Sequence, residues 1–431
     1  MTDPTASTDP AEAGLDPCAQ RRNIAVYTAI IALIYLAAPV LYVGFVQAAL
    51  CKRLNTSDTV ANLPSTVYLG TAWFPILLAW VFPQARLLKP LLTFFFGVMA
   101  VGSALLAGIL LAPVPDTVIV GALIGHAALL GCANGAVFTL SWEALSRGVS
   151  AGLLGRALGL AFGWGPAFAV LGSLVAQTLL EGKLFGRSPP SWLIASYPQN
   201  YALLYAGTAA SMGLAAFLVR LYRIPVPAAE PPRQMFGASI RDGFRALAGH
   251  RVLLIACAAY LLVSAGNTIQ NNMSLFTGEA VGRSPEDLAG YQLSLRFSCK
   301  MLAGFLLGWL LARTNPKVPL LVTVGLQIAA VAWVLFVPGY WFLLAFGLNG
   351  AAELCGVYYM NYPVQCSAKA DVRRNIAFIM LVSSVVGLAP LGFGWISDHA
   401  SLQASFYAAL VLLTFTAVLV AVKLPAHPSP R

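Results

Sequence analysis

The chain has 431 residues, of which 59% are hydrophobic and only 10% are charged, and its mean hydropathy is +0.77. A soluble domain carries about 25% charged residues, so this composition excludes a water-soluble fold and indicates a chain that lies mostly in lipid. The net charge of +10 does not indicate nucleic-acid binding, because the basic residues fall in short runs between apolar stretches and form no single patch.

Residues 1–22 are expected to form a disordered cytoplasmic tail, because residues 1–20 contain no Lys or Arg and are rich in Pro, Ala, Ser and Thr. A cleavable signal is not expected, since a signal begins basic and then turns apolar. Twelve apolar runs follow, which predicts an all-α, polytopic membrane protein with twelve transmembrane helices. The runs lie at about 24–50, 62–83, 88–112, 116–143, 151–181, 200–222, 251–275, 288–312, 318–338, 340–364, 375–397 and 402–423.

The basic residues between the runs predict the topology. With the N-terminus placed inside, the inside segments hold 19 Lys and Arg residues and the outside segments hold 5. Cytoplasmic loops carry such an excess, so both termini are expected in the cytoplasm of a multi-pass protein of the bacterial inner (plasma) membrane. The five outside residues are Lys52, Arg53, Lys183, Arg187 and Arg283.

The longest loop, residues 224–250, divides the spans into an N-terminal bundle (23–223) and a C-terminal bundle (251–424), with a short tail at 425–431. The loop opens with several prolines, which is typical of a linker. Apolar residues at positions 236, 240, 244 and 247 then share one helical face. This spacing predicts an amphipathic helix on the inner membrane surface, with a soluble linker helix as the alternative.

Six plus six spans, cytoplasmic termini and a central basic loop resemble the major facilitator superfamily. That family has a signature after its second span, repeated after its eighth: a Gly, a small or acidic position, an Arg and further basic residues. The second copy is similar to the segment from Gly308 to Lys317, which contains Arg313 but has Ala312 in the acidic position. The first copy keeps Arg86 and lacks the glycine.

The resemblance implies two six-helix bundles that expose a midplane site to each side in turn. It also implies a gating role for Arg313, Lys317 and Arg86, whose short turns would close against the opposite bundle. The alternative is that these turns are basic only because they lie on the inside.

Three charged residues fall well inside apolar runs, where an ionised side chain needs a partner. Arg296 and Lys300 are four residues apart on one helical face, and Glu353 lies in the tenth run. One acid against two bases leaves an excess positive charge, which favours an anionic or carboxylate-bearing substrate. The alternative is a structural ion pair. Glu353 is also the candidate proton-coupling residue, since burial and nearby cations shift a carboxyl pKa in opposite directions.

The seventh run carries a polar face that includes Asn267, Gln270 and Asn271. Amides facing lipid would leave unsatisfied donors, so this face is expected to look inward. In the resembled family the first, fourth, seventh and tenth spans line the central cavity, which implies that these residues bind substrate. Hydrogen bonding between helices is the alternative.

The fourth run carries His126 and Glu143, further candidates for proton coupling or an ion pair. A hydrogen-bonded packing role for His126 and a pair with Arg147 for Glu143 are the alternative interpretations. Proton antiporters of the family often have an Arg in this span, where Gly131 stands here. The fifth run approximates their glycine-rich motif around Gly165 and Pro166.

No nucleotide-binding loop, zinc-protease motif or metal-binding cluster appears in the sequence, so neither an enzyme nor a cofactor or metal site is expected. The preferred function is a secondary active transporter of a small organic anion or zwitterion, with the proton as candidate coupling ion. The expected partners are that small molecule and membrane lipid, and the oligomeric state, monomer included, stays open. The alternatives are efflux of an apolar or cationic compound by proton antiport, and a non-transporting scaffold or assembly factor.

Overall fold

The computed structural model describes most of the chain. The described residues are 16–71, 73–82, 84–149, 151–183, 187, 195–225, 237, 241, 244–245, 248–360, 362, 366, 379, 381–382 and 384–428. The predicted amphipathic helix of the 224–250 loop lies largely outside them. All twelve predicted apolar runs contain helix, and nine helical stretches in the described part are long and apolar enough to cross a membrane. The protein is therefore a multi-pass helical membrane protein, as predicted.

The helices divide into an N-terminal and a C-terminal half. The N-terminal half contains α1 Pro17–Leu36, α2 Ala38–Leu41, α3 Phe45–Arg53, α4 Asp58–Gly70, α5 Phe74–Val81, η2 Ala85–Leu87, α6 Leu88–Leu111, α7 Asp116–Gly148, α8 Ala151–Glu181 and α9 Gln199–Val219. The C-terminal half contains α11 Arg251–Asn267, α12 Gln270–Leu275, α13 Thr277–Val281, α14 Pro285–Arg313, α15 Lys317–Phe336, η4 Gly339–Leu343, α16 Leu344–Ala352, α17 Cys355–Tyr359, η5 Ser384–Gly387, α20 Leu388–His399 and α21 Leu402–Lys423.

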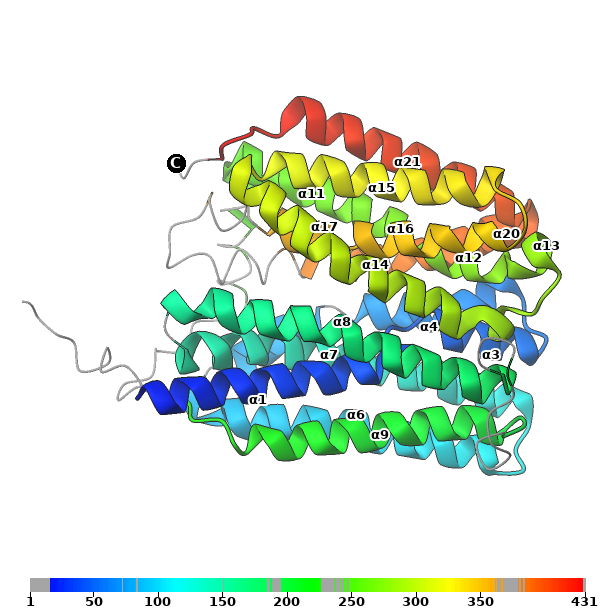
Figure 1. The fold of residues 1–431 in the computed structure, drawn as a ribbon, viewed down its shortest axis with the longest axis horizontal. Coiled ribbons are helices and arrows are strands. Elements are labelled where there is room, and N and C mark those ends of the chain that lie inside the picture. The colour runs from blue at the N-terminus through cyan, green and yellow to red at the C-terminus, as the bar shows by residue number, and fades with distance from the viewer. Residues whose placement is uncertain are drawn as a thin grey trace, which may run out of the picture.

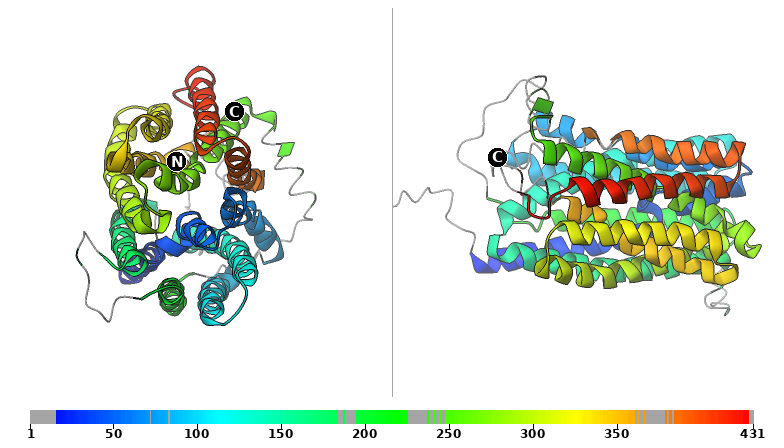
Figure 2. Two further views of the ribbon diagram at one scale, coloured as in Figure 1. Left: turned by 90° about the vertical axis from the view of Figure 1, so that its right-hand side faces the viewer. Right: turned by 90° about the horizontal axis from the view of Figure 1, so that it is seen from above.

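The two halves lie as two layers of roughly parallel helices (Figure 1). Helix α8 packs against α14, and α4 packs against α20, so these four helices join the halves. Seen along the helices, the two halves together form a ring of spans (Figure 2). The first helix begins, and the last described residues end, at the same end of the molecule (Figure 1). We call the opposite end the far end; there α8 and α14 lie side by side, whereas they diverge toward the termini.

Local capping explains where several spans begin at the far end. Ser57 accepts a hydrogen bond from the backbone of Val60 and so caps α4, and Ser401 does the same for α21. Ser284 and Asp287 form a capping box at the start of α14, with Pro285 in its first turn.

Three apolar runs that line the contact between the halves are interrupted, although the sequence predicted unbroken spans. The first run breaks after α2 at Gly44, whose φ of 142° is one that other residues rarely adopt. The seventh breaks between α11 and α12, and the tenth breaks at Glu353 between α16 and α17. Neither of the last two breaks contains a Gly or Pro, so no local residue pattern indicates them. Broken helices at mid-membrane depth are tolerated where they face a protein interior.

Candidate functional site

The three charged residues predicted inside the spans come together in one cluster. Arg296 and Lys300 lie one turn apart on α14, and both face Glu353 at the break in the tenth run. The Nε atom of Arg296 is 2.5 Å from one Glu353 carboxylate oxygen, and the Nζ atom of Lys300 is 3.1 Å from the other. The Arg296 and Glu353 side chains are only 5% and 6% exposed, against 14% for Lys300. We call Arg296 and Lys300 the cation pair.

Aromatic residues from both halves surround the cation pair. The guanidinium of Arg296 lies 5.3 Å from the ring centre of Tyr42 and 5.1 Å from that of Phe45, both in the first span. The ammonium of Lys300 lies 5.4 Å from the Tyr42 ring, and Phe297 packs edge-on against Tyr42. Such cation–π contacts contribute up to about 2 kcal/mol when water is excluded. The cluster therefore belongs to the C-terminal half but is closed by the N-terminal half.

The charges in the cluster do not cancel. Two cations share one carboxylate, so the group carries a net charge of one positive unit with Arg296, Lys300 and Glu353 ionised. Among the described residues, the Nη1 atom of Arg296 has no hydrogen-bond partner, although it is buried. A buried charged donor without a partner is unfavourable, and a carboxylate or similar anion would satisfy it. The cluster can therefore accept an anion.

The polar residues of the seventh run have separate partners. Asn267 accepts a hydrogen bond from Gln327 of α15 at 3.3 Å, and Gln270 accepts one from Asn349 of α16 at 3.1 Å. Asn271 instead donates to Asn62 of α4 at 3.1 Å, and so bridges the two halves. Asn267 is thus brought together with the ninth run and Gln270 with the tenth, while Asn271 lies at the interface between halves.

The backbone of the first span approaches Asn271 closely. A Cβ atom at Gly44 would lie 2.2 Å from the Asn271 side-chain oxygen, so only glycine fits there. Asn272, which the sequence interpretation did not select, accepts a hydrogen bond from Asn62 at 2.9 Å and donates to Ser405 of α21. A run of adjacent amides in an apolar span was the available signal for Asn272.

The two candidates in the fourth span lie apart from this cluster. His126 is buried between helices of the N-terminal half, where its Nε2 atom is 3.1 Å from the Ser103 hydroxyl and its ring packs edge-on against Tyr205. Glu143 pairs with Arg147 one turn later at 2.9 Å. His126 is thus hydrogen-bonded within the N-terminal half, and Glu143 is ion-paired within its own helix.

The three candidate gating residues lie near the end that holds the termini. Arg313 stacks on Trp309 of its own helix, with 4.8 Å to the ring centre, and Lys317 donates to the carbonyl of Ala421 at 2.7 Å. Arg86 lies exposed in η2. The contacts described for Arg313 and Lys317 are thus made within the C-terminal half.

Known proteins resemble this chain in fold and not in sequence. No family model and no curated protein sequence matches the chain. Among solved structures, a D-xylose–proton symporter superposes with a TM-score of 0.68 at 16% identity, covering 94% of this chain and 98% of that one. The nucleoside transporter NupG superposes with a TM-score of 0.63 at 13% identity, covering 93% and 98%. The E. coli fucose–proton symporter FucP gives 0.62 at 16% identity, covering 94% and 98%.

The chain has the major facilitator fold. The predicted architecture is confirmed at this level, without a subfamily. In this major facilitator fold, the breaks of the first, seventh and tenth spans lie around the cation pair and its amide neighbours.

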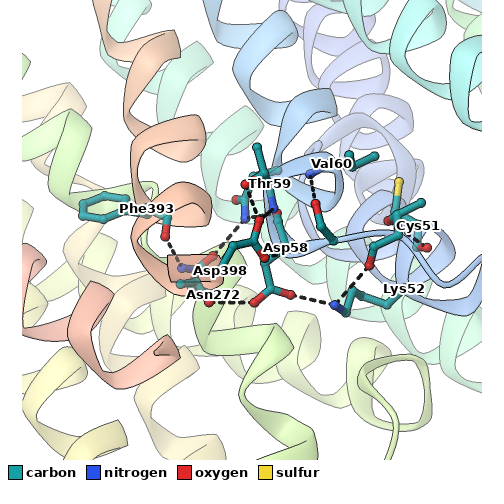
Figure 3. Close-up of polar contacts among 12 residues, drawn as sticks. Cys51, Lys52, Asp58, Thr59, Val60, Asn272, Phe393 and Asp398 are labelled. Carbon is teal, nitrogen blue, oxygen red and sulfur yellow. Dashed lines mark hydrogen bonds and ion pairs between the residues drawn. The ribbon is translucent and has the colours of Figure 1, made fainter. Parts of the chain in front are cut away.

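Polar contacts join the two halves of the major facilitator fold at the far end. Asp398 of α20 accepts hydrogen bonds from the backbone amides of Asp58 and Thr59, both at 2.9 Å, and one from the Thr59 hydroxyl (Figure 3). These amides are among the unpaired donors of the first turn of α4, so the C-terminal half caps a helix of the N-terminal half. Asp58 also pairs with Lys52 at 2.7 Å (Figure 3). It accepts a further hydrogen bond from the Ser397 hydroxyl.

A second group of far-end contacts lies where α8 and α9 approach α14. Glu286 pairs with Arg53 at 2.5 Å and accepts a hydrogen bond from the Tyr201 hydroxyl at 2.9 Å. Arg283 pairs with Glu181 at 2.8 Å. The side-chain oxygen of Gln177 accepts from the Gly290 amide at 2.8 Å.

The sequence interpretation counted Lys52, Arg53 and Arg283 only as sparse outside charges and missed their partners. The available signal was that the acidic residues Asp58, Glu181, Glu286 and Asp398 also fall at outside ends of spans.

Proposed function

We propose that the protein is a secondary active transporter that moves a small organic anion or zwitterion across a bacterial inner membrane by alternating access. The observation that carries this proposal is the excess positive charge of the cation pair, held between the two halves at the level of three helix breaks. The major facilitator fold supports it, since ligand sites in such folds lie at the interface of the repeats. The similar structures include two sugar–proton symporters and a nucleoside transporter, which supports solute transport for this chain and leaves its solute open.

With both termini in the cytoplasm, the far end faces the outside. The far-end contacts then keep the outside closed, so this conformation would load or release substrate on the cytoplasmic side. In the opposite conformation the far-end contacts break, and the turns that hold Arg313, Lys317 and Arg86 close against the other half. Reagents that label an introduced cysteine in the 224–250 loop only from outside would contradict this orientation.

The cation pair is tested by Arg296→Ala and Lys300→Ala variants. Each is expected to weaken binding of an anionic ligand by about tenfold or more, because hydrogen bonds to charged groups contribute about 1.5–3 kcal/mol each. Purified protein is screened by ligand-dependent thermal stabilisation against small carboxylates, zwitterions and lipophilic cations. The exposed Lys423→Ala is the matched control and should behave as wild type.

The outcomes of that screen separate the possible functions. Unchanged anion affinity in both variants would remove the anion site. Stabilisation by lipophilic cations instead would indicate efflux by proton antiport. If a co-purifying protein raises the thermal stability of the purified protein and no small molecule does, the result would indicate a scaffold.

Glu353 is proposed as the residue that couples transport to protons. Because its carboxylate holds both cations, its protonation would free them for the substrate. Glu353→Gln is therefore expected to abolish accumulation driven by a proton gradient in vesicles while leaving substrate exchange in place. Wild-type uptake that does not depend on the proton gradient would contradict this role. Glu143→Gln serves as the control, because Glu143 pairs with Arg147 on its own helix in the N-terminal half, away from the cation pair.

A further inference from the structure

Two buried amides beside the cation pair have unused hydrogen-bond acceptors. Asn349 and Gln327 are each only 1% exposed. Their side-chain nitrogens are engaged, that of Asn349 with Gln270 and that of Gln327 with Asn267. In the described part of the chain, the side-chain oxygens of Asn349 and Gln327 have no hydrogen-bond partner. Leaving a buried polar atom unpaired costs about 1–3 kcal/mol, so an unpaired pair at one place needs an explanation.

Both amides lie close to the break of the tenth run at Glu353. Asn349 lies one helical turn before it, and the Glu353 backbone amide donates to the Asn349 carbonyl at 3.0 Å. Residues four apart lie on the same face of a helix, so the Asn349 side chain lies next to that of Glu353. The nitrogen of Gln327 is 3.8 Å from the sulfur of Cys355, two residues after Glu353. The cation pair on α14 and these amides on α15 and α16 therefore lie around the same break of the tenth run.

The charges restrict what can occupy this site. The cation pair and Glu353 together carry one excess positive unit. A ligand with one carboxylate and a neutral hydrogen-bond donor would cancel that excess and also use the free acceptors. A zwitterion would use the acceptors through its ammonium group but would leave the excess in place. A plain carboxylate would cancel the charge and leave the acceptors unpaired.

We propose that the site takes a small hydroxycarboxylate, with its carboxylate on Arg296 and Lys300 and its single hydroxyl proton shared between the oxygens of Asn349 and Gln327 in a three-centre hydrogen bond. This inference rests on the proposed transport of an anion and narrows its substrate class. The hydroxyl is what distinguishes the substrate from other monocarboxylates of the same size.

The test compares three probes of similar size on purified full-length protein: lactate, propionate and alanine. Dissociation constants are measured by calorimetry in detergent. Wild-type protein is expected to bind lactate about two- to tenfold more tightly than propionate, because one neutral hydrogen bond contributes about 0.5–1.5 kcal/mol. Alanine should bind more weakly than lactate, since it leaves the excess charge uncompensated.

Two variants assign the selectivity to its residues. Asn349→Leu and Gln327→Met are each expected to bring lactate affinity down toward that of propionate, while propionate affinity changes less than about twofold, because propionate makes no hydrogen bond with the removed amide. Thr416→Val is the matched control, because this buried hydroxyl donates to Leu412 within its own helix α21. It should leave the ratio of lactate to propionate affinity unchanged.

The outcomes separate this inference from the proposed function. If no anion binds wild-type protein, the anion-transport proposal itself fails. If lactate and propionate bind equally and Arg296→Ala weakens both, the anion site stands and the hydroxycarboxylate assignment is overturned. Tighter binding of alanine than of lactate overturns it as well. If Asn349→Leu and Gln327→Met weaken the binding of all three probes by the same factor, these amides have a purely structural role and the assignment is overturned.

Discussion

Replacement of Glu353 by alanine is expected to reduce the free energy of unfolding by about 3–5 kcal/mol, because it leaves Arg296 and Lys300 buried without their shared carboxylate. Thermal unfolding of the purified protein in detergent measures the change. The double variant Glu353→Ala/Lys300→Met should recover part of the loss, since it removes one of the two uncompensated charges. The single and double variants together report the coupling between the two residues.

Added anions provide a second, sharper readout of the same variant. A small carboxylate can occupy the space that the Glu353 side chain leaves and pair with the cation pair there. Acetate is therefore expected to stabilise Glu353→Ala more than it stabilises the wild-type protein. Glu143→Ala, which removes a carboxylate from an ion pair with Arg147 outside the cluster, should show no such gain. Equal acetate effects in all three proteins would contradict the view that the cation pair can bind an anion once the Glu353 carboxylate is removed.

Valine at Gly290 is expected to prevent the two halves from closing at the far end. A Cβ atom there would lie 2.4 Å from both the Ser173 carbonyl oxygen and the Gln177 Cβ of α8, so backbone would have to move. Overpacking of this kind costs about 1–3 kcal/mol, which corresponds to a shift of roughly 5- to 150-fold toward the conformation that is open at the far end. The fraction of protein open at the far end should rise accordingly.

The opening is measured as the distance between spin labels on Lys183→Cys, two residues after α8, and Glu279→Cys, within α13. The exposed Cys18 is first replaced by serine. Gly304→Val is the matched control on the same helix, because a Cβ atom at Gly304 meets nothing within 4 Å. It should leave the label distance at its wild-type value. A Gly290→Val protein with the wild-type distance would show that the close approach of α8 and α14 does not set the conformation.

Much of the site could be predicted because ionised groups are rare in this chain's spans. Arg296, Lys300 and Glu353 stand out against apolar neighbours, and two bases with one acid had to find each other or a ligand. In the structure, Arg296 and Lys300 both pair with the Glu353 carboxylate. Asn267 and Gln270 also bond to neighbouring spans of the C-terminal half, although nothing local in the sequence indicated Gln327 and Asn349 as their partners.

Other parts of the site depend on segments far apart in the chain. Tyr42 and Phe45 are two aromatic residues among many, and nothing near them indicates that they cover cations more than 250 residues later. The capping of α4 by Asp398 joins residues about 340 positions apart. Such contacts depend on how the two halves approach each other, which local pattern does not encode.

The sequence by itself determined that the chain crosses the membrane many times as helices, since each apolar span must satisfy its own backbone hydrogen bonds in lipid. It also determined which few side chains need internal partners. Only the tertiary structure decided where spans break, as at Glu353, and which end of the molecule is closed. Those features arise from packing between the two halves, where side chains such as Asn62 and Asn271 meet across an interface that no single span contains.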